Sequence, residues 1–384
     1  MARADVDDGN GSRLIVVFLR GAVDGLNVVP PHGDSAYYDA RPTIAIGQSS
    51  IVDLDGRFGL HPALSPLMAL WRERSLAFVQ ACGSPDPTRS HFDAQDFMET
   101  ATPGIRDTPD GWMNRLLAAL PSPHRTTAAL NLGPVVPRIL AGRMAVANLP
   151  MGPGAAHPIP LDRPRIEEPF ASLYQGNDPL SRAFQQGYQA RRKLLSEIAG
   201  DMNAADHGAP APDQAFAASC SRLGYLMARD PGIRLAFMSL GGWDTHVNQG
   251  AGSGQLANHL RLLGEGLVSL VQGLGKAYPH TVIVVMSEFG RTVRENGNGG
   301  TDHGHANVMW VAGGKVRGGK IYGRWPGLAE ADLYQGRDVA VTTDFRAVLS
   351  VVIRRHLAIG GGALHAILPG FSGDSNGLED LIEV

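Results

Sequence analysis

The run Thr281–Met286, with the sequence TVIVVM, most constrains what this chain can fold into. It is short, β-branched and apolar at every position, which is typical of a strand buried on both faces of a parallel sheet. Leu14–Leu19 has the same character, and Ser75–Ala81 and Leu235–Leu240 are predicted as further strands. An open α/β sheet places its chemistry at the carboxyl ends of its strands. The residues that follow each run are therefore the first candidates for a site.

The composition is that of a soluble globular protein with a large core, since 43% of the 384 residues are hydrophobic and 18% are charged. The net charge is -3 with no basic stripe, which gives no support to a nucleic-acid partner. No run of eighteen apolar residues exists, so no membrane span is predicted. Cys82 and Cys220 allow one disulfide or two buried thiols. The polar N-terminus has no apolar signal core, which predicts a cytoplasmic protein or one whose signal was removed before this numbering begins.

One α/β domain is predicted from residue 14 to residue 357. Residues 133–178 are rich in proline, glycine and alanine, and are interpreted as an insertion or lid over one face rather than as sheet. Residues 1–13 and 360–384 are predicted to be flexible or peripheral tails.

Asp24 follows the first strand and is flanked by glycine, in the sequence GAVDGLN. An acid just past a first strand is a favoured position for a ligand. The alternative is an ordinary Asp-Gly turn.

Ser90 stands where a loop after the strand Ser75–Ala81 becomes a helix. It has the position of an N-cap, with Asp93 three residues on as a shortened capping-box partner. It could also be a nucleophile, because a helix N-terminus stabilises an alkoxide and binds an anion. A nearby divalent cation would activate its hydroxyl.

Asp244 and His246 follow the strand Leu235–Leu240, in the sequence GGWDTH. Two residues apart in extended chain, they point to the same side and can share one ion. The alternative for His246 is an ordinary surface histidine.

Glu288 and Arg291 follow Thr281–Met286, and a glycine- and asparagine-rich loop then ends in Asp302-His303-Gly304-His305. Oxygen and imidazole ligands without thiolates suit Zn, Mn, Mg or Ca. Two such ions with a serine between them would suit phosphoryl or sulfuryl transfer.

Several ordered motifs together resemble a known family: FLRGAVDGLN, RSHFDAQD, GGWDTH, SEFGRT and TDHGHAN. They are similar to a bacterial sulfatase-like family of unknown function in the alkaline-phosphatase-like superfamily, which includes sulfatases, phosphodiesterases and cofactor-independent phosphoglycerate mutases. The resemblance runs from Leu14 to about Gly323. It implies a three-layer α/β sandwich with a central, mostly parallel sheet. It also implies export by a twin-arginine signal, and so a periplasmic or secreted location.

The resemblance implies roles for the residues after the first three strands. Asp24 matches a metal-ligating acid, and Ser90 matches the nucleophile at a helix start. Asp244 and His246 match the Asp and His that bind the first metal, although the superfamily usually spaces them further apart.

The resemblance is incomplete at the second metal. Glu288 matches the Asp of an Asp-His pair, but Phe289 stands where the His is expected. His303 or His305 matches a final histidine, and the spare one, or Asp302, could replace the missing ligand. The resemblance therefore implies one or two divalent ions.

A formylglycine sulfatase is not expected. Those enzymes start their helix with Cys or Ser, any residue, Pro, Ser and Arg, whereas the nearest string here is Pro85-Asp86-Pro87-Thr88-Arg89. Proline stands where the modified cysteine should be, and Cys82 is three residues too early.

Two functions are compatible with these residues. The first is a metal-dependent hydrolase of a phosphate or sulfate ester of a small molecule or glycan. Its nucleophile would be Ser90, with Arg89, His91 or Arg291 as oxyanion partners. The second is a non-catalytic protein that holds one metal or an anionic ligand on a degraded site. Phe289 favours the second function, whereas the intact acid, serine and Asp-x-His motifs favour the first, which is the prediction.

Overall fold

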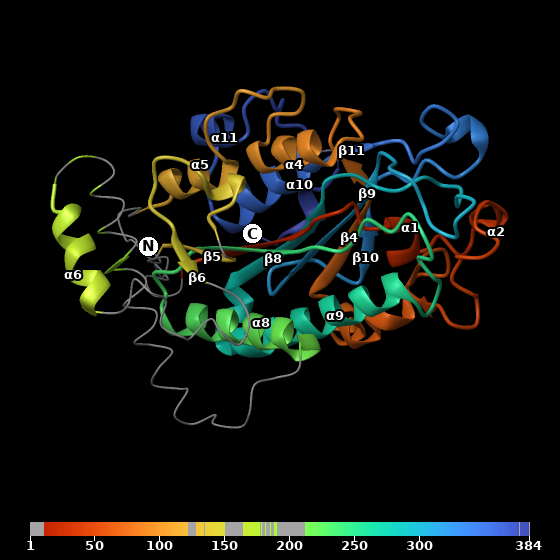
Figure 1. Cartoon of the computed structure of the whole chain (residues 1–384). Helices are drawn as coiled ribbons and strands as arrows, with labels where there is room; N and C mark the ends of the chain where they lie inside the picture. The colour runs from red at the N-terminus through yellow and green to blue at the C-terminus, as the bar shows by residue number, and fades with distance from the viewer. Residues whose placement is uncertain are drawn as a thin grey trace, which may run out of the picture.

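The computed structural model describes residues 11–121, 128–133, 135–149, 164–176, 178, 181, 185, 188–189, 212–375 and 377–383. The predicted α/β class is confirmed, because helices cover both faces of a nine-stranded sheet (Figure 1). The strands of this sheet are β1 (Arg13–Leu19), β4 (Leu76–Gly83), β5 (Ala129–Leu132), β6 (Ala147–Leu149), β7 (Leu235–Leu240), β8 (Thr281–Ser287), β9 (Asn307–Gly313), β10 (Lys320–Tyr322) and β11 (Thr343–Asp344).

The order across the sheet is β10-β4-β9-β8-β1-β7-β5-β6, and β11 pairs with β4. β1 lies between β7 and β8 and is parallel to both, with Leu14 opposite Leu235 and Val282. Every residue of β1 and β8 is buried, which explains why these strands are apolar at every position except their end residues Arg13, Thr281 and Ser287. β9 alone runs antiparallel to its neighbours, β4 and β8. A separate antiparallel hairpin pairs β2 (Val52–Asp53) with β3 (Gly59–Leu60).

One face of the sheet packs against α8 (Pro212–Arg229) and α9 (Gln255–Leu274), which lie side by side below it in Figure 1. The alternate residues Ile15, Val17 and Leu19 of β1 face this core. The two helices can approach closely because each has a glycine at the contact, Gly224 in α8 and Gly273 in α9. A Cβ at Gly224 would lie 2.5 Å from the carbonyl oxygen of Leu270, and one at Gly273 would lie 2.3 Å from that of Ser221. The same layer contains η1 (Pro62–Leu67) and α3 (Met68–Arg72).

The opposite face carries Leu14, Val16 and Phe18 and a second core, which completes the predicted three layers. Its helices are α4 (His91–Thr100), α5 (Trp112–Ala119), α10 (Phe345–Val351), the π-helical η7 (Val352–His356) and α11 (Gly361–Ile367). The segment after residue 360 was predicted to be a flexible or peripheral tail. This is wrong for most of it, because Ile367, Leu381 and Ile382 are fully buried in the second core.

Part of the predicted insertion also differs from expectation. β6 lies within residues 133–178 and adds a parallel strand beside β5, so this part is sheet. Residues 150–163 lie outside the described structure, and α6 (Pro164–Leu173) follows them.

Cys82 and Cys220 are both buried free thiols. No helix in the described ranges is long and apolar enough to cross a membrane. The remaining short helices are α1 (Gly25–Val28), α2 (Ser35–Ala40), η2 (Arg138–Leu140), η5 (Gly275–His280), η6 (Glu330–Asp332) and η8 (Glu379–Leu381).

The topology explains why distant motifs meet at one edge. β1, β4, β7 and β8 are oriented alike in the sheet, so their carboxyl ends lie at the same edge. β9 runs the other way, and its first residue, Asn307, pairs with Cys82 near the end of β4. The loop that precedes β9 therefore reaches the edge where the other strands end. This edge carries the Asp302–His305 segment beside the loops after β1, β7 and β8.

Candidate metal centre

Three histidines and one aspartate converge at this edge. His91 is the first residue of α4, Asp244 and His246 follow β7, and His303 precedes β9. The Oδ1 atom of Asp244 lies 3.0 Å from His246 Nε2, 3.3 Å from His303 Nε2 and 3.5 Å from His91 Nε2. His303 Nε2 is also 3.0 Å from the Nε2 atoms of both His91 and His246. We call these four residues the histidine cluster.

The other ring nitrogen, Nδ1, faces a hydrogen-bond acceptor in all three histidines. The acceptors are Glu288 Oε1 at 2.8 Å from His91, Asp302 Oδ1 at 3.0 Å from His246, and the Arg89 carbonyl oxygen at 2.8 Å from His303. Carboxylates and carbonyls only accept, so each Nδ1 carries a proton and each Nε2 faces the cluster. Metal-binding histidines in proteins are commonly oriented in this way.

Two Nε2 atoms 3.0 Å apart attract each other only if one ring carries an Nε2 proton and donates it to the other, or if a cation lies between their lone pairs. Tetrahedral ligands bound at about 2.0–2.1 Å lie about 3.3 Å apart. The three distances among His91, Asp244 and His303, which are 3.0–3.5 Å, match this spacing. Imidazole nitrogens suit Zn and other transition metals, whereas Mg and Ca prefer oxygen ligands. The donor set therefore fits a divalent transition-metal ion.

The two carboxylates nearest the histidines are held in the ionised form. Burial raises the pKa of Asp244, but the hydrogen bond and charge of Arg291 and the neighbouring histidines outweigh it, so the pKa lies below its ordinary value. Burial likewise raises the pKa of Glu288, and hydrogen bonds from His91, Gln95 and Gly21 bring it below the ordinary value. The hydrogen bond to Glu288 in turn raises the pKa of His91.

Glu288 was predicted as a metal ligand, but the structure places it behind His91. It is buried, and its Oε1 atom also accepts from Gly21 N at 2.8 Å and Gln95 Nε2 at 2.9 Å. Phe289 packs against the cluster, with its ring 4.9 Å from that of His91 and 5.1 Å from that of His303. These two residues orient and shield the histidines.

Asp302 has the same relation to His246 that Glu288 has to His91. Its Oδ1 atom accepts from His246 Nδ1 at 3.0 Å and from Asn296 Nδ2 at 3.1 Å. Burial raises the pKa of Asp302, but hydrogen bonds from Asn296 and His246 lower it further than burial raises it. Asp302 was predicted as a ligand, and its observed contact is with the ring that would be the ligand.

Asp24 and His305 lie outside the histidine cluster, although both were predicted to bind metal. Asp24 is buried, and both of its oxygens accept hydrogen bonds from Arg41 and Gln249. His305 Nε2 lies 3.1 Å from the Ser84 carbonyl oxygen, and its ring packs against Tyr334. The structure therefore separates these two side chains from the other predicted ligands.

The two predicted oxyanion arginines are bound to the protein itself. Arg291 is buried and donates to Asp244 Oδ1 at 2.6 Å and to four backbone carbonyls, which ties the ends of β1 and β7 together. Arg89 Nε and Nη2 donate to Asp338 Oδ2 at 3.1 and 2.6 Å. Only its backbone carbonyl reaches the cluster, at His303.

Ser90 is the N-cap of α4, as expected. Its exposed side chain accepts from Asp93 N at 3.4 Å. The next residue in the chain is His91, so this hydroxyl stands at the margin of the histidine cluster. The role of Ser90 as a nucleophile stays a prediction.

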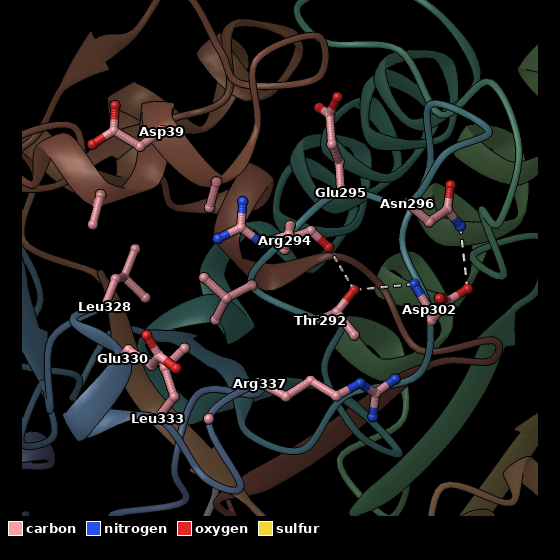
Figure 2. Close-up of a pocket in the computed structure, with 14 residues that line it drawn as sticks. Asp39, Thr292, Arg294, Glu295, Asn296, Asp302, Leu328, Glu330, Leu333 and Arg337 are labelled. Carbon is pink, nitrogen blue, oxygen red and sulfur yellow. Dashed lines mark hydrogen bonds between the residues drawn. The ribbon is translucent and has the colours of Figure 1, made fainter.

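A pocket of about 610 Å³ adjoins the histidine cluster through Asp302 (Figure 2). Its floor is apolar and belongs to a third, smaller core that includes Ala40, Val293 and Leu328. The rim is charged. In Figure 2 the guanidinium of Arg337 lies at the Asp302 end. The other charged lining residues are Asp39, Arg294, Glu295 and Glu330.

The sequence over residues 11–368 matches the family described as "Protein of unknown function (DUF1501)". The chain belongs to this family. The match agrees with the family of unknown function that the motifs predicted. No curated protein matches this DUF1501 chain in sequence.

Several solved structures are similar to the DUF1501 chain. Ps i-CgsB in complex with k-i-k-neocarrahexaose shares 12% identity over 93% of this chain and 74% of its own, with a TM-score of 0.41. The lipoteichoic acid synthase LtaP from Listeria monocytogenes shares 10% identity over 92% of this chain and 73% of its own, with a TM-score of 0.38. A mutant TAB5 alkaline phosphatase with Mg bound in the M3 site shares 11% identity over 82% of this chain and 94% of its own, with a TM-score of 0.34.

Reasoning from the sequence missed two kinds of residue in the DUF1501 chain. His91 was predicted as an oxyanion partner, whereas its Nε2 atom lies within the cluster of possible ligands. The available signal was its place at a helix start that follows a strand end. Arg41 and Gln249, which bind Asp24, carry no local motif that could have indicated this contact.

Proposed function

We propose that this chain is a metal-dependent hydrolase of a phosphate or sulfate ester. The observation that carries the proposal is the histidine cluster: His303 Nε2 lies 3.0 Å from the Nε2 atoms of His91 and His246, and Asp244 Oδ1 lies 3.0–3.5 Å from all three. Every ring is held by an acceptor on its far side. Three imidazole nitrogens and a carboxylate oxygen that converge in this way, with each ring oriented from its far side, are best explained as a metal site.

The ligands in this proposal are His91, Asp244, His246 and His303. A divalent ion bound there would polarise an ester oxygen and favour ionisation of a nearby hydroxyl. Glu288, Asp302 and the carbonyl of Arg89 fix the three rings. Phe289 covers two of the rings and excludes water from that side.

Ser90 is the proposed nucleophile. Its oxygen would form a bond to phosphorus or sulfur while the bond to the leaving oxygen breaks, and water would then hydrolyse the serine ester. The hydroxyl must turn from Asp93 N to do this, and the 3.4 Å separation of the two atoms indicates a weak hydrogen bond. The N-terminus of α4 then faces the developing negative charge.

The organic part of the substrate is proposed to enter the pocket beside Asp302. Its volume of about 610 Å³ lies within the range of small-molecule sites, and its lining combines apolar side chains with charged ones that could bind a polar ester. Such a site suits the ester of a small molecule or a single sugar unit of a glycan. A periplasmic or secreted location is proposed with it, on the family resemblance.

A non-catalytic metal- or anion-binding role is the second candidate. It is favoured by the engagement of the Ser90 hydroxyl as a helix cap and of both arginines by protein acceptors. In this case the histidine cluster would hold its ion without turnover.

The test combines metal analysis with a panel of chromogenic phosphate monoesters, diesters and sulfates. Bound metal together with turnover that a chelator removes would support the hydrolase. Bound metal without turnover would favour the binding role, and no bound metal would contradict both.

Two variants at Ser90 separate nucleophile from cap. Ser90→Ala removes both functions, whereas Ser90→Asn keeps a good cap without a nucleophile. Both should abolish turnover while the metal content stays that of the unmodified protein. Turnover that survives in Ser90→Asn would refute the nucleophile assignment.

A further inference from the structure

A buried ion pair occupies the place where the sequence predicted a metal-binding carboxylate. Asp24 and Arg41 are both 0% exposed. Arg41 Nη1 donates to Asp24 Oδ2 at 2.6 Å, and Nη2 donates to Asp24 Oδ1 at 3.0 Å. This is the two-pronged geometry in which a guanidinium binds a carboxylate most strongly.

Arg41 is fixed from every nitrogen. Beyond Asp24 it donates to the carbonyls of Thr292 at 2.8 Å and Val293 at 2.9 Å, and to Asn27 Oδ1 at 2.8 Å. Arginine stays charged in proteins, so it cannot leave this place as a neutral group. A cation that displaced it would strand a buried charge and its acceptors, which is strongly unfavourable.

The third partner of Asp24 also selects against a metal. Gln249 Nε2 donates to Asp24 Oδ2 at 2.7 Å. The orientation of this amide is fixed, because its oxygen accepts from Thr245 Oγ1 at 2.7 Å and Thr301 Oγ1 at 3.0 Å. Asp24 is therefore surrounded by donors alone, as suits an anion that is already neutralised.

We infer that the chain binds one divalent ion and that the guanidinium of Arg41 replaces a second one at Asp24. This inference rests on the proposed metal site for the first ion. It also gives the ion pair a positioning role, because Gln249 links Asp24 to Thr245, and Thr245 lies between the ligands Asp244 and His246. The pair thus supports the loop of the single-ion site.

The experiment is a count of ions per chain. The full chain is stripped with a chelator, titrated with Zn²⁺ in a calorimeter, and then desalted for elemental analysis. We expect one tight site per chain, and none in His303→Ala. Two tight sites in the unmodified chain would overturn the inference, whereas none would instead contradict the proposed metal site.

A neutral double variant, Asp24→Asn with Arg41→Met, tests whether Asp24 is a ligand of the bound ion. It removes both charges while keeping similar volume, a kind of change that buried ion pairs often tolerate. One ion should still bind, with at most a tenfold loss of affinity through the Thr245 link. Complete loss of the ion would show that Asp24 is a ligand and would refute the inference. If the double variant does not fold, the titration of the unmodified chain still decides the number of sites.

Discussion

Removing the carboxylate of Asp302 should weaken metal binding without harming the fold. Its Oδ1 atom accepts the Nδ1 proton of His246 at 3.0 Å, which fixes the tautomer that presents Nε2 to the cluster. The side chain is 52% exposed, so its loss leaves little buried surface unfilled. Loss of such an outer partner typically reduces metal affinity by about 10- to 100-fold, or about 1.4–2.7 kcal/mol. Because water can replace part of the bond, about tenfold is expected for Asp302→Ala and less for Asp302→Asn.

The assay is a competition titration against a chromogenic chelator at fixed pH and ionic strength. Asp39→Ala is the matched control, because Asp39 lines the same pocket and has no hydrogen bond to the cluster histidines in the described structure. Both variants remove one negative charge, so an effect of the net charge of the protein alone would appear in both. Thermal unfolding of the metal-free proteins should show all variants close to the unmodified chain.

Two results would refute this reasoning. An unchanged affinity in Asp302→Ala would mean that the carboxylate does not orient His246 for a metal. An equal loss in Asp39→Ala would mean that overall charge, rather than the hydrogen bond, sets the affinity.

Two further predictions concern stability. Gly290→Ala should destabilise the fold by about 3 kcal/mol or more, because its Cβ would lie 1.8 Å from the Ala306 carbonyl oxygen. The control Gly297→Ala has open space around its Cβ and should cost less than about 0.5 kcal/mol, so similar urea midpoints for the two variants would contradict the prediction. Burial lowers the pKa of His356 from 6.5 to about 4. Between pH 6.5 and pH 4 this histidine is therefore protonated in the unfolded chain but neutral in the folded chain, and the free energy of unfolding falls by about 3 kcal/mol as the pH drops through this range. Urea unfolding of the metal-free protein should show a shallower pH dependence for His356→Gln, and parallel curves would contradict the assignment.

The strands of the sheet could be predicted because each one is recognisable from its own short stretch of sequence. β1, β7 and β8 are apolar at nearly every position, and a strand buried on both faces has no other composition. Because parallel strands end at a common edge, the same pattern predicted that Asp244 and His246 would lie beside the residues that follow β8, and the structure brings them to His303. The tail after residue 360 was not predictable in this way, because its leucines and isoleucines are isolated in a glycine-rich sequence and are buried only by contact with α5 and the second core.

Within the site, the roles depended on contacts that sequence spacing does not encode. Glu288 and Asp302 are acids at a strand end or loop, as a ligand would be, yet each accepts from the far nitrogen of a histidine. Glu288 follows β8 and Asp302 precedes β9, so their positions relative to the histidine rings depend on how β8 pairs with β1 and how β9 pairs with β4. A pattern of residues can therefore predict that a site exists before it can assign ligands and supports.

The contrast between Asp24 and Asp244 shows what separates a structural acid from a candidate ligand at the same edge. Asp24 is fully buried, and Arg41 gives this buried carboxylate a permanent counter-charge inside the fold. The side chain of Asp244 is 45% exposed and faces three imidazoles as well as Arg291. Burial thus separates the two acids: the inner one is neutralised when the chain folds, whereas the outer one is the one that, in the proposed function, would bind a cation from solution.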